Sequence, residues 1–466
     1  MLSLFGVLNM GGESLSAQQD ATALAGQNLA NVNNPAYADE QLQLQESTPL
    51  DTAIGEEGTG VDAVSITSMR NALLDAQVAA EGSVTGSLTA QQSALQNAEA
   101  YLNEQLSNNS SSSAASSSTG LTADLSSLFS SLQTLSTDPS NISDRQAVIQ
   151  SAQQLTEQFN QVSSGLSTVT SDLNTSIQNG VTAVNQDLSQ IASLNKQIMV
   201  AQGSGGTADQ LEDEREQTIE NLAGYVNLTT SAQANGAVNV DVGGINMVNG
   251  DTVTDTLDTI TSNGKIYAAS VNDGELTLTS GSIAGSVTAR DGTVTTLQNS
   301  LDTLAGQLIT QVNGVYEGGT DLNGNSGQPF FTGSDAATIG VNGSLVNDPS
   351  AFQASSTGQP GDNGVVLAMA QLADTPLADL NNQTMSQYYS QAVGSFGSSL
   401  QSVNEQLTNS TSVAQMLTTQ RASASGVDTD TEMTNLLQFQ KAYEASAELI
   451  STVNEMLSTV VNMKTE

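Results

Sequence analysis

The sequence has no cysteine, no histidine and no tryptophan, and only 3% of its 466 residues are aromatic. Without cysteine it can form neither a disulfide framework nor a thiolate nucleophile. Without histidine it lacks an imidazole base, so its many serines cannot join a Ser-His-Asp triad. A core with so few aromatic side chains must consist of Leu, Val, Ile and Ala, which suits seams between helices. We therefore expect no enzyme, no catalytic residues, no cofactor and no metal site.

Basic residues are also scarce: nine Lys and Arg face 48 Asp and Glu, for a net charge of −39. Such a surface repels phosphate backbones and lacks the basic clusters that bind anionic lipid. No segment approaches the roughly 18 consecutive apolar residues of a membrane span. The apolar start has no basic flank, so we expect no cleavable signal peptide. These features predict a protein that contacts neither nucleic acid nor membrane.

The segment 143–200 carries the clearest periodicity. Apolar residues recur at alternating steps of four and three, which is the 3.5-residue repeat of a coiled-coil seam. The seam consists of Val148, Ala152, Leu155, Phe159, Val162, Leu166, Val169 and Leu173, and then of Val181, Val184, Leu188, Ile191, Leu194 and Ile198. Two steps of four through Ile177 form a stutter between these halves. One apolar stripe needs partners, so this helix predicts an elongated bundle.

The period changes near Gly224 and becomes helical again further on. Valines alternate with polar residues at 238–242, and Asn249-Gly250, Asn263-Gly264 and Asp273-Gly274 are typical of hairpin turns. With Leu276–Leu278 and Val287–Ala289 as further strands, we expect a small antiparallel β domain at about 226–289. Helices are predicted before it at about 66–106 and 123–135, and after it at about 294–316 and 365–419. A serine-rich tract at 107–120 is predicted to be a flexible loop.

The fold class that follows is mainly α with an inserted β domain. The N- and C-terminal parts form an elongated helical bundle or coiled-coil rod, and the small antiparallel β domain lies at its far end. Three regions are expected: a terminal helical region at 1–65 plus 426–466, a helical rod at 66–225 plus 357–425, and an outer β-rich insertion at 226–356.

Both ends of the chain carry amphipathic helices with one apolar face. The first, at 13–31, presents Leu15, Thr22, Ala25 and Leu29; the second follows Gly426. Weak single-faced helices at opposite ends favour pairing with each other or with neighbouring copies. The assembly residues predicted from these helices and from the turn after the first one are Leu15, Asn28, Leu29, Asn31, Pro35, Tyr37, Leu436, Phe439, Gln440, Tyr443, Ile450, Val453, Leu457 and Val460.

The run from Asn28 to Tyr37 resembles the Asn-Ile-Ala-Asn-x-Asn-Thr-Pro-Gly-Tyr signature of the axial flagellar (rod and hook) family, with Asn34 for Thr and Ala36 for Gly. Asp39 stands where the family often has Arg. The runs 432–447 and 450–463, together with motifs in the middle of the chain, resemble the hook-associated members of that family. In the middle these are Phe159-Asn160, 191–198, 211–216, Gly314, 319–324 and Phe330-Phe331.

This resemblance implies an extracellular structural subunit of the bacterial flagellum that joins hook to filament and allows filament assembly. It further implies type III export and four partners: the hook protein, a second junction protein, copies of the chain itself and a cytoplasmic export chaperone. Two alternatives remain open. One is another axial protein of hook or distal rod, and the other is a secreted adhesin or enzyme on a helical stalk.

Two groups of polar residues could be interpreted either as functional sites or as ordinary structural elements. Asp321, Asn323 and Asn325 match the first ligands of a calcium loop, but Ser326 and Thr332 stand where Gly and Glu are required, which favours a simple turn. The carboxylates at 212–216 could imitate an acid/base pair, but solvated contacts along a helix explain them better.

Overall fold

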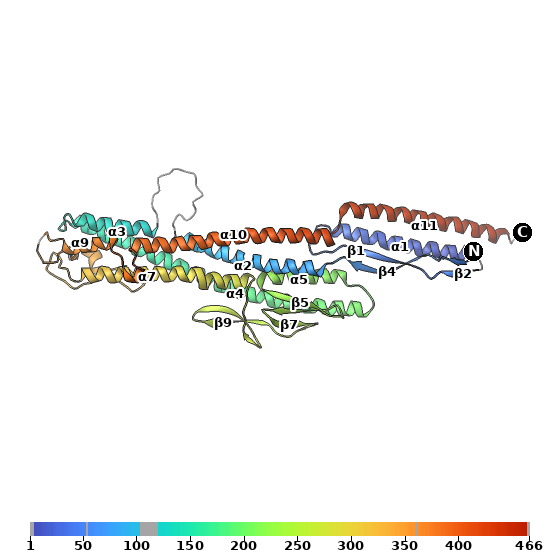
Figure 1. Ribbon diagram of the computed structural model, residues 1–466, viewed down its shortest axis with the longest axis horizontal. Coiled ribbons are helices and arrows are strands. Elements are labelled where there is room, and N and C mark those ends of the chain that lie inside the picture. Colours follow the sequence, from blue (N-terminus) through green and yellow to red (C-terminus); the bar gives the residue numbers. More distant parts are fainter. Residues whose placement is uncertain (1–3, 53–54, 103–119, 360, 464–466) are drawn as a thin grey trace.

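The computed structural model describes residues 4–52, 55–102, 120–359 and 361–463. They form one elongated, mainly helical body in which the first and last helices lie together at one end (Figure 1). The fold class is confirmed: a helical rod with a small antiparallel β region. Within this part of the chain, no helix is long and apolar enough to cross a membrane.

The rod is built around helix α4, Ile142–Gly203, whose 62 residues run unbroken through the stutter. Every residue of the predicted seam is buried. The other rod helices are α2 (Ala72–Leu102), α3 (Leu121–Leu135), α5 (Asp209–Tyr225), α7 (Thr295–Tyr316), α9 (Gly364–Gln371) and α10 (Met385–Ser425). Helix α6 (Ser282–Ala289) leads through a π-helical turn at Arg290–Val294 into α7. The serine-rich tract at 107–119 lies outside the described residues.

Two hydrophobic clusters divide the length of α4. The first half packs with α2, α3, α7, α9 and α10 at the tip of the rod. Edge-to-face contacts among Tyr316, Phe330, Phe331 and Phe352 concentrate aromatic rings there. The second half packs with α5, α6 and the β region. The short elements β12 (Phe331–Thr332), β13 (Gly340–Val341) and α8 (Gly343–Asn347) complete the tip.

The β region forms two antiparallel sheets. One has the order β5-β6-β7-β8, from Leu228–Ala232, Val238–Val242, Ile245–Asn249 and Thr252–Val253; the other has the order β11-β10-β9, from Gly274–Glu275, Lys265–Ser270 and Leu257–Ser262. The predicted turn at Asn263-Gly264 joins β9 to β10, and both residues have positive φ, as a two-residue hairpin requires. The sheets lie along the flank of α4 (Figure 1) instead of at the far end of the rod, where we expected them.

Four local predictions were wrong. The helix expected at 365–419 is two helices, α9 and α10, separated by residues 372–384. Val287–Ala289 belongs to α6, because Ile283 and Ala284 bury this segment against α2 and α4 and packing overrides β propensity. Leu276–Leu278 lies outside the strands. The helix expected from Ile66 begins only at Ala72, because Val61–Ser68 is strand β4 and pairs antiparallel with β1, Glu40–Glu46. A smaller hairpin, β2 (Leu50–Thr52) with β3 (Gly55–Glu57), lies between them in the chain.

Close packing of α2 against α5 depends on a glycine. A Cβ atom at Gly86 would lie 2.4 Å from the carbonyl oxygen of Gly224, whereas a Cβ at Gly82, one turn earlier, meets nothing within 4 Å.

We expect Gly86→Ala to lower the free energy of unfolding by about 1–3 kcal/mol, because the two backbones must separate. Gly82→Ala is the matched control and should raise it by up to about 1 kcal/mol through helix propensity. Thermal unfolding of the two full-length variants measures both, and equal effects would contradict the assigned packing.

Candidate assembly site

Helices α1, Leu4–Asn31, and α11, Thr429–Met463, form an antiparallel pair at one end of the molecule (Figure 1). Small residues on α1 allow the close approach: Gly11 lies against Ile450, and a Cβ there would be 2.9 Å from Cγ1 of that side chain. The hydroxyl groups of Ser14 and Ser446 are 3.1 Å apart. Together with β1–β4 this pair forms a unit, residues 4–68 and 429–463, that we call the terminal module.

The pair leaves much of α11 uncovered. Of its 35 residues, only Glu432 and Val453 are buried. Leu449, Met456, Val460 and Met463 follow one another at steps of seven, four and three and are all exposed, with Met463 at 76%. These four residues, which we call the outer stripe, form a second apolar face beside the one that contacts α1. Such a face is stable in water only when another surface covers it.

The predicted site residues divide into three groups. Asn28, Tyr37 and Val453 are buried. Half-buried residues are Leu15, Leu29, Asn31, Leu436, Phe439, Ile450 and Leu457. Pro35, Gln440, Tyr443 and Val460 are exposed. On α1 the buried stripe is Ala17, Ala21, Leu24, Ala25 and Asn28, so Leu15 and Leu29 lie beside it and do not form its centre.

The turn after α1 is organised by the side chain of Asn28. Its Oδ1 accepts the hydroxyl of Tyr37 at 2.6 Å and the backbone N–H of Glu40 at 3.3 Å. Its Nδ2 donates to the Glu40 carbonyl at 2.9 Å and to Asp39 Oδ1 at 2.8 Å. Tyr37 therefore packs back against the helix, and Asp39 takes part in the turn. Asn34 Oδ1 accepts the N–H of Ala36, which fixes the chain between them.

Replacing Asn28 by Ala should lower the stability of the terminal module by about 1–3 kcal/mol, because a buried hydroxyl and a buried backbone N–H lose their acceptor. Asn31→Ala is the control, since that side chain bonds only the carbonyl of Gln27 on its own helix. Limited proteolysis of the full chain should cut the first variant faster at residues 32–48 while the control stays close to the native rate. The reverse order would contradict the role of Asn28.

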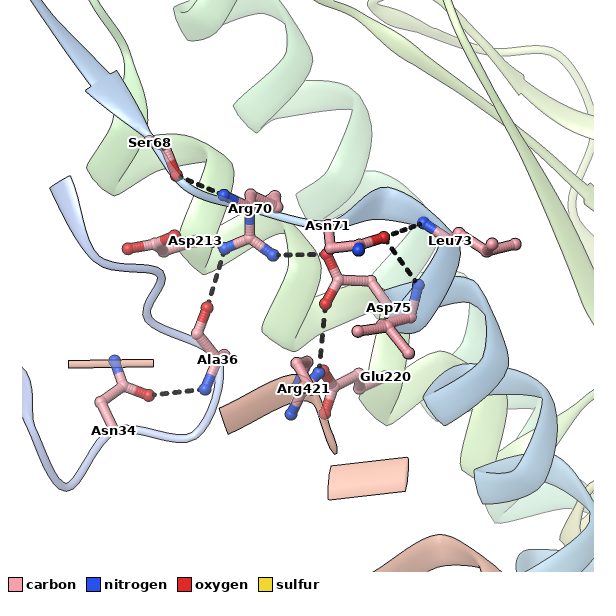
Figure 2. Close-up of polar contacts among 11 residues, drawn as sticks. Asn34, Ala36, Ser68, Arg70, Asn71, Leu73, Asp75, Asp213, Glu220 and Arg421 are labelled. Atoms are coloured by element: carbon pink, nitrogen blue, oxygen red, sulfur yellow. Dashed lines mark hydrogen bonds and ion pairs between the residues drawn. The ribbon is translucent and has the colours of Figure 1, made fainter. Parts of the chain in front are cut away.

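A buried ionic cluster connects the terminal module to the rod (Figure 2). Arg70, between β4 and α2, donates to the carbonyl of Ala36 at 2.8 Å and pairs with Asp75 at 3.1 Å and with Asp213 on α5. Arg421, in the last turn of α10, pairs with Asp75 and Glu220. We call this cluster the joint.

Sequence reasoning missed the joint. The interpretation of the carboxylates at 212–216 as solvated was wrong for Asp213, which is 8% exposed and pairs with an arginine 143 positions away. Arg215 is also buried, donating to Asn195 and to the carbonyl of Gly236. The available signal was the rarity of basic residues. With nine Lys and Arg in 466 positions, each one is a candidate partner for a buried carboxylate.

Two carboxylates, Asp213 in the joint and Glu216 beside it, have raised pKa values. Burial, reinforced by Asp75, raises the pKa of Glu216 to about 7 against an ordinary 4.5. Burial also raises the pKa of Asp213 to about 6, although Arg70 opposes the shift. A raised pKa means that the folded state binds more protons than the unfolded chain. The stabilising contribution is therefore complete below the ordinary values and is lost as pH rises through about 6 to 7.

The full chain should accordingly be more stable towards urea at pH 5.5 than at pH 8. Glu216→Gln should flatten this dependence, because the amide cannot ionise. Glu214→Gln, at an exposed position on the same helix, should keep the native slope. A native chain whose unfolding free energy rises between pH 5.5 and 8 would refute the assignment.

Asp321 forms a turn: its Oδ1 accepts the N–H groups of Asn323 at 2.7 Å and Asn325 at 2.8 Å. Among the described residues, no three acidic side chains converge in a way that could hold a metal ion.

Comparison with known proteins connects this geometry to a family. The sequence family described as flagellar hook-associated protein FlgK helical domain matches residues 106–331, and flagellar basal body rod FlgEFG protein C-terminal matches residues 418–463. Flagellar hook-associated protein 1 of Bacillus subtilis (strain 168) is 28% identical, with 99% of each chain covered. The protein of the same name from Escherichia coli (strain K12) is 23% identical over 98% of this chain and 100% of its own.

One solved structure, the flagellar hook junction protein FlgK from Burkholderia pseudomallei, has a TM-score of 0.63 at 17% identity. It covers 74% of this chain and 99% of its own, and this likeness concerns the fold.

A helical rod that ends in paired terminal helices, together with these matches, resembles the axial structural proteins of the bacterial flagellum. Within that class, the chain is matched by proteins named flagellar hook-associated protein 1, which it resembles over nearly its whole length.

Proposed function

We propose that the chain is a subunit of the junction between hook and filament, located outside the cell. Its partners there are the hook protein, a second junction protein and further copies of itself, and an export chaperone binds it in the cytoplasm. The names of the relatives support the junction over a place in the hook itself or the distal rod.

The observation that carries the proposal is the outer stripe of α11. A helix whose inner face pairs with α1 and whose outer face stays exposed fits a subunit that neighbours must cover. Heterologous contacts repeated by a screw operation generate a tube from such a subunit.

In this assignment the three expected regions have separate roles. The terminal region, 1–65 plus 426–466, forms the inner tube. The rod, 66–225 plus 357–425, forms the next layer, and the insertion, 226–356, faces outward. The predicted assembly residues in contact between α1 and α11 shape each subunit, while Tyr443 and Val460 contact neighbouring ones.

Replacing two residues of the outer stripe tests the proposal. Met456→Ser with Val460→Ser removes exposed apolar surface, so the free chain should unfold within about 0.5 kcal/mol of the native one. A strain that lacks the native gene and carries this variant should release filament protein into the medium and swim poorly.

Asn454→Ser with Thr459→Ser alters exposed polar positions on the same helix and should support normal filaments. Deletion of 440–466 should leave a folded rod and abolish assembly. Normal filaments in the deletion strain would overturn the proposed function.

A further inference from the structure

The joint differs from the rest of the molecule in having no apolar core. Among the described residues, neither hydrophobic cluster of the rod continues into the terminal module. A cavity of about 120 Å³ lies between the two parts, lined by residues of the turn after α1 and the end of α10. Ser425 lines it, and its buried hydroxyl has no hydrogen-bond partner. Polar contacts therefore determine how the terminal module sits on the rod.

Glu40, the first residue of β1, is a buried acidic group of the terminal module, two residues beyond Ala38, whose N–H donates to Asp213 on α5. It is 4% exposed. Its Oε2 accepts Gln27 Nε2 at 3.2 Å, while its Oε1 is buried without a partner. An ionised carboxylate in that position leaves one charged oxygen uncompensated, which costs far more than burying the neutral acid.

The groups around Glu40 are mainly acidic. The negative charges of Asp209 and Asp213 on α5 repel an ionised Glu40, and so does that of Asp39, the preceding residue. Glu432 of α11 is also buried, and with Glu40 it lines a groove between α1, β1 and α11 inside the terminal module. From α1, Gln27 and Asn28 offer amide groups and no charge. Arg70 is already engaged by Asp75, Asp213 and the Ala36 carbonyl.

We propose that the joint is a proton-operated latch, in which neutral Glu40 lets the terminal module dock on α5 and ionised Glu40 drives it away from Asp209 and Asp213.

The chain connections suit such a movement. Only two backbone segments cross the joint, at 69–71 and at 426–428, and the second follows the break between α10 and α11 at Gly426. The contacts that must separate are few: Arg70 to the Ala36 carbonyl, the N–H of Ala38 to Asp213, and the N–H of Asp39 to the Ser425 carbonyl. Arg70 retains Asp75 on its own side, so it can serve as the pivot.

Burial, and then the charges of Asp209, Asp213 and Asp39, raise the pKa of Glu40 to about 7. The docked arrangement is thus favoured at lower pH and weakens as pH rises through that value.

Distance measurements on the full-length chain test the latch. The native chain has no cysteine, so spin labels attach only at two introduced cysteines. We place these at exposed positions, Gln19→Cys on α1 and Thr182→Cys on α4. Electron–electron double resonance should give one narrow distribution of the distance between the two labels at pH 5.5. At pH 8.5 the displaced population should increase severalfold, with half of the change near pH 7.

In the same labelled chain, Glu40→Gln should keep the narrow distribution at both pH values. Asp209→Asn removes the opposing charge from the rod side and should reduce the displaced population at pH 8.5. Glu46→Gln, at an exposed position on β1, should behave as the native chain does.

Circular dichroism at both pH values confirms that the helices remain folded. A native distribution that does not change with pH, or a Glu40→Gln chain that still responds, would overturn the latch. The measurement uses the free chain, so its outcome is independent of whether filaments assemble.

Discussion

The whole rod depends on one constraint: the 62-residue helix α4 has a single apolar seam that nothing within the helix can cover. Helices α2, α3, α5, α6 and α7 and the two sheets of the β region each cover part of it. The elements that cover the seam change at the stutter Leu173–Ile177–Val181. Leu173 is the last residue of α4 in the hydrophobic cluster at the tip, and Ile177 is the first in the cluster with the sheets. A local shift in the phase of the seam thus turns its second half towards a different set of partners.

Periodic features of this fold were predictable because a periodic pattern reports burial directly. The seam of α4 and the glycine-containing turn at Asn263-Gly264 were located correctly for that reason. The hairpin of β1 and β4 was missed although Leu42 and Leu44 alternate with glutamines, since the stripe that begins at Ile66 suggested a helix. Helix α6 was missed because its identity is decided by packing against α2 and α4 and not by its β-branched residues.

The candidate site was predictable only in part, for a related reason. The end helices and the turn after the first one follow from local sequence, whereas the hydrogen bond of Tyr37 to Asn28 was seen only in the structure. The joint does not, because its ion pairs connect residues separated by 143, 201 and 346 positions. No local pattern marks such partners. In a chain with nine basic residues, the two arginines at the joint, Arg70 and Arg421, nevertheless account for a large share of the charge that could neutralise a buried carboxylate.

The contrast between seam and joint explains how one chain can be both stiff and adjustable. Apolar interdigitation along α4 fixes the neighbours of that helix, because displacing any of them opens a cavity. At the joint, separation exchanges a few hydrogen bonds for contacts with water, and each exchange changes the free energy by only about 0.5–1.5 kcal/mol. A subunit whose outer stripe must match neighbouring chains benefits from a terminal module that can change its angle without disturbing the rod. Carboxylates outnumber guanidinium groups there, so an added negative charge is not neutralised. The protonation state of Glu40 can therefore set this angle.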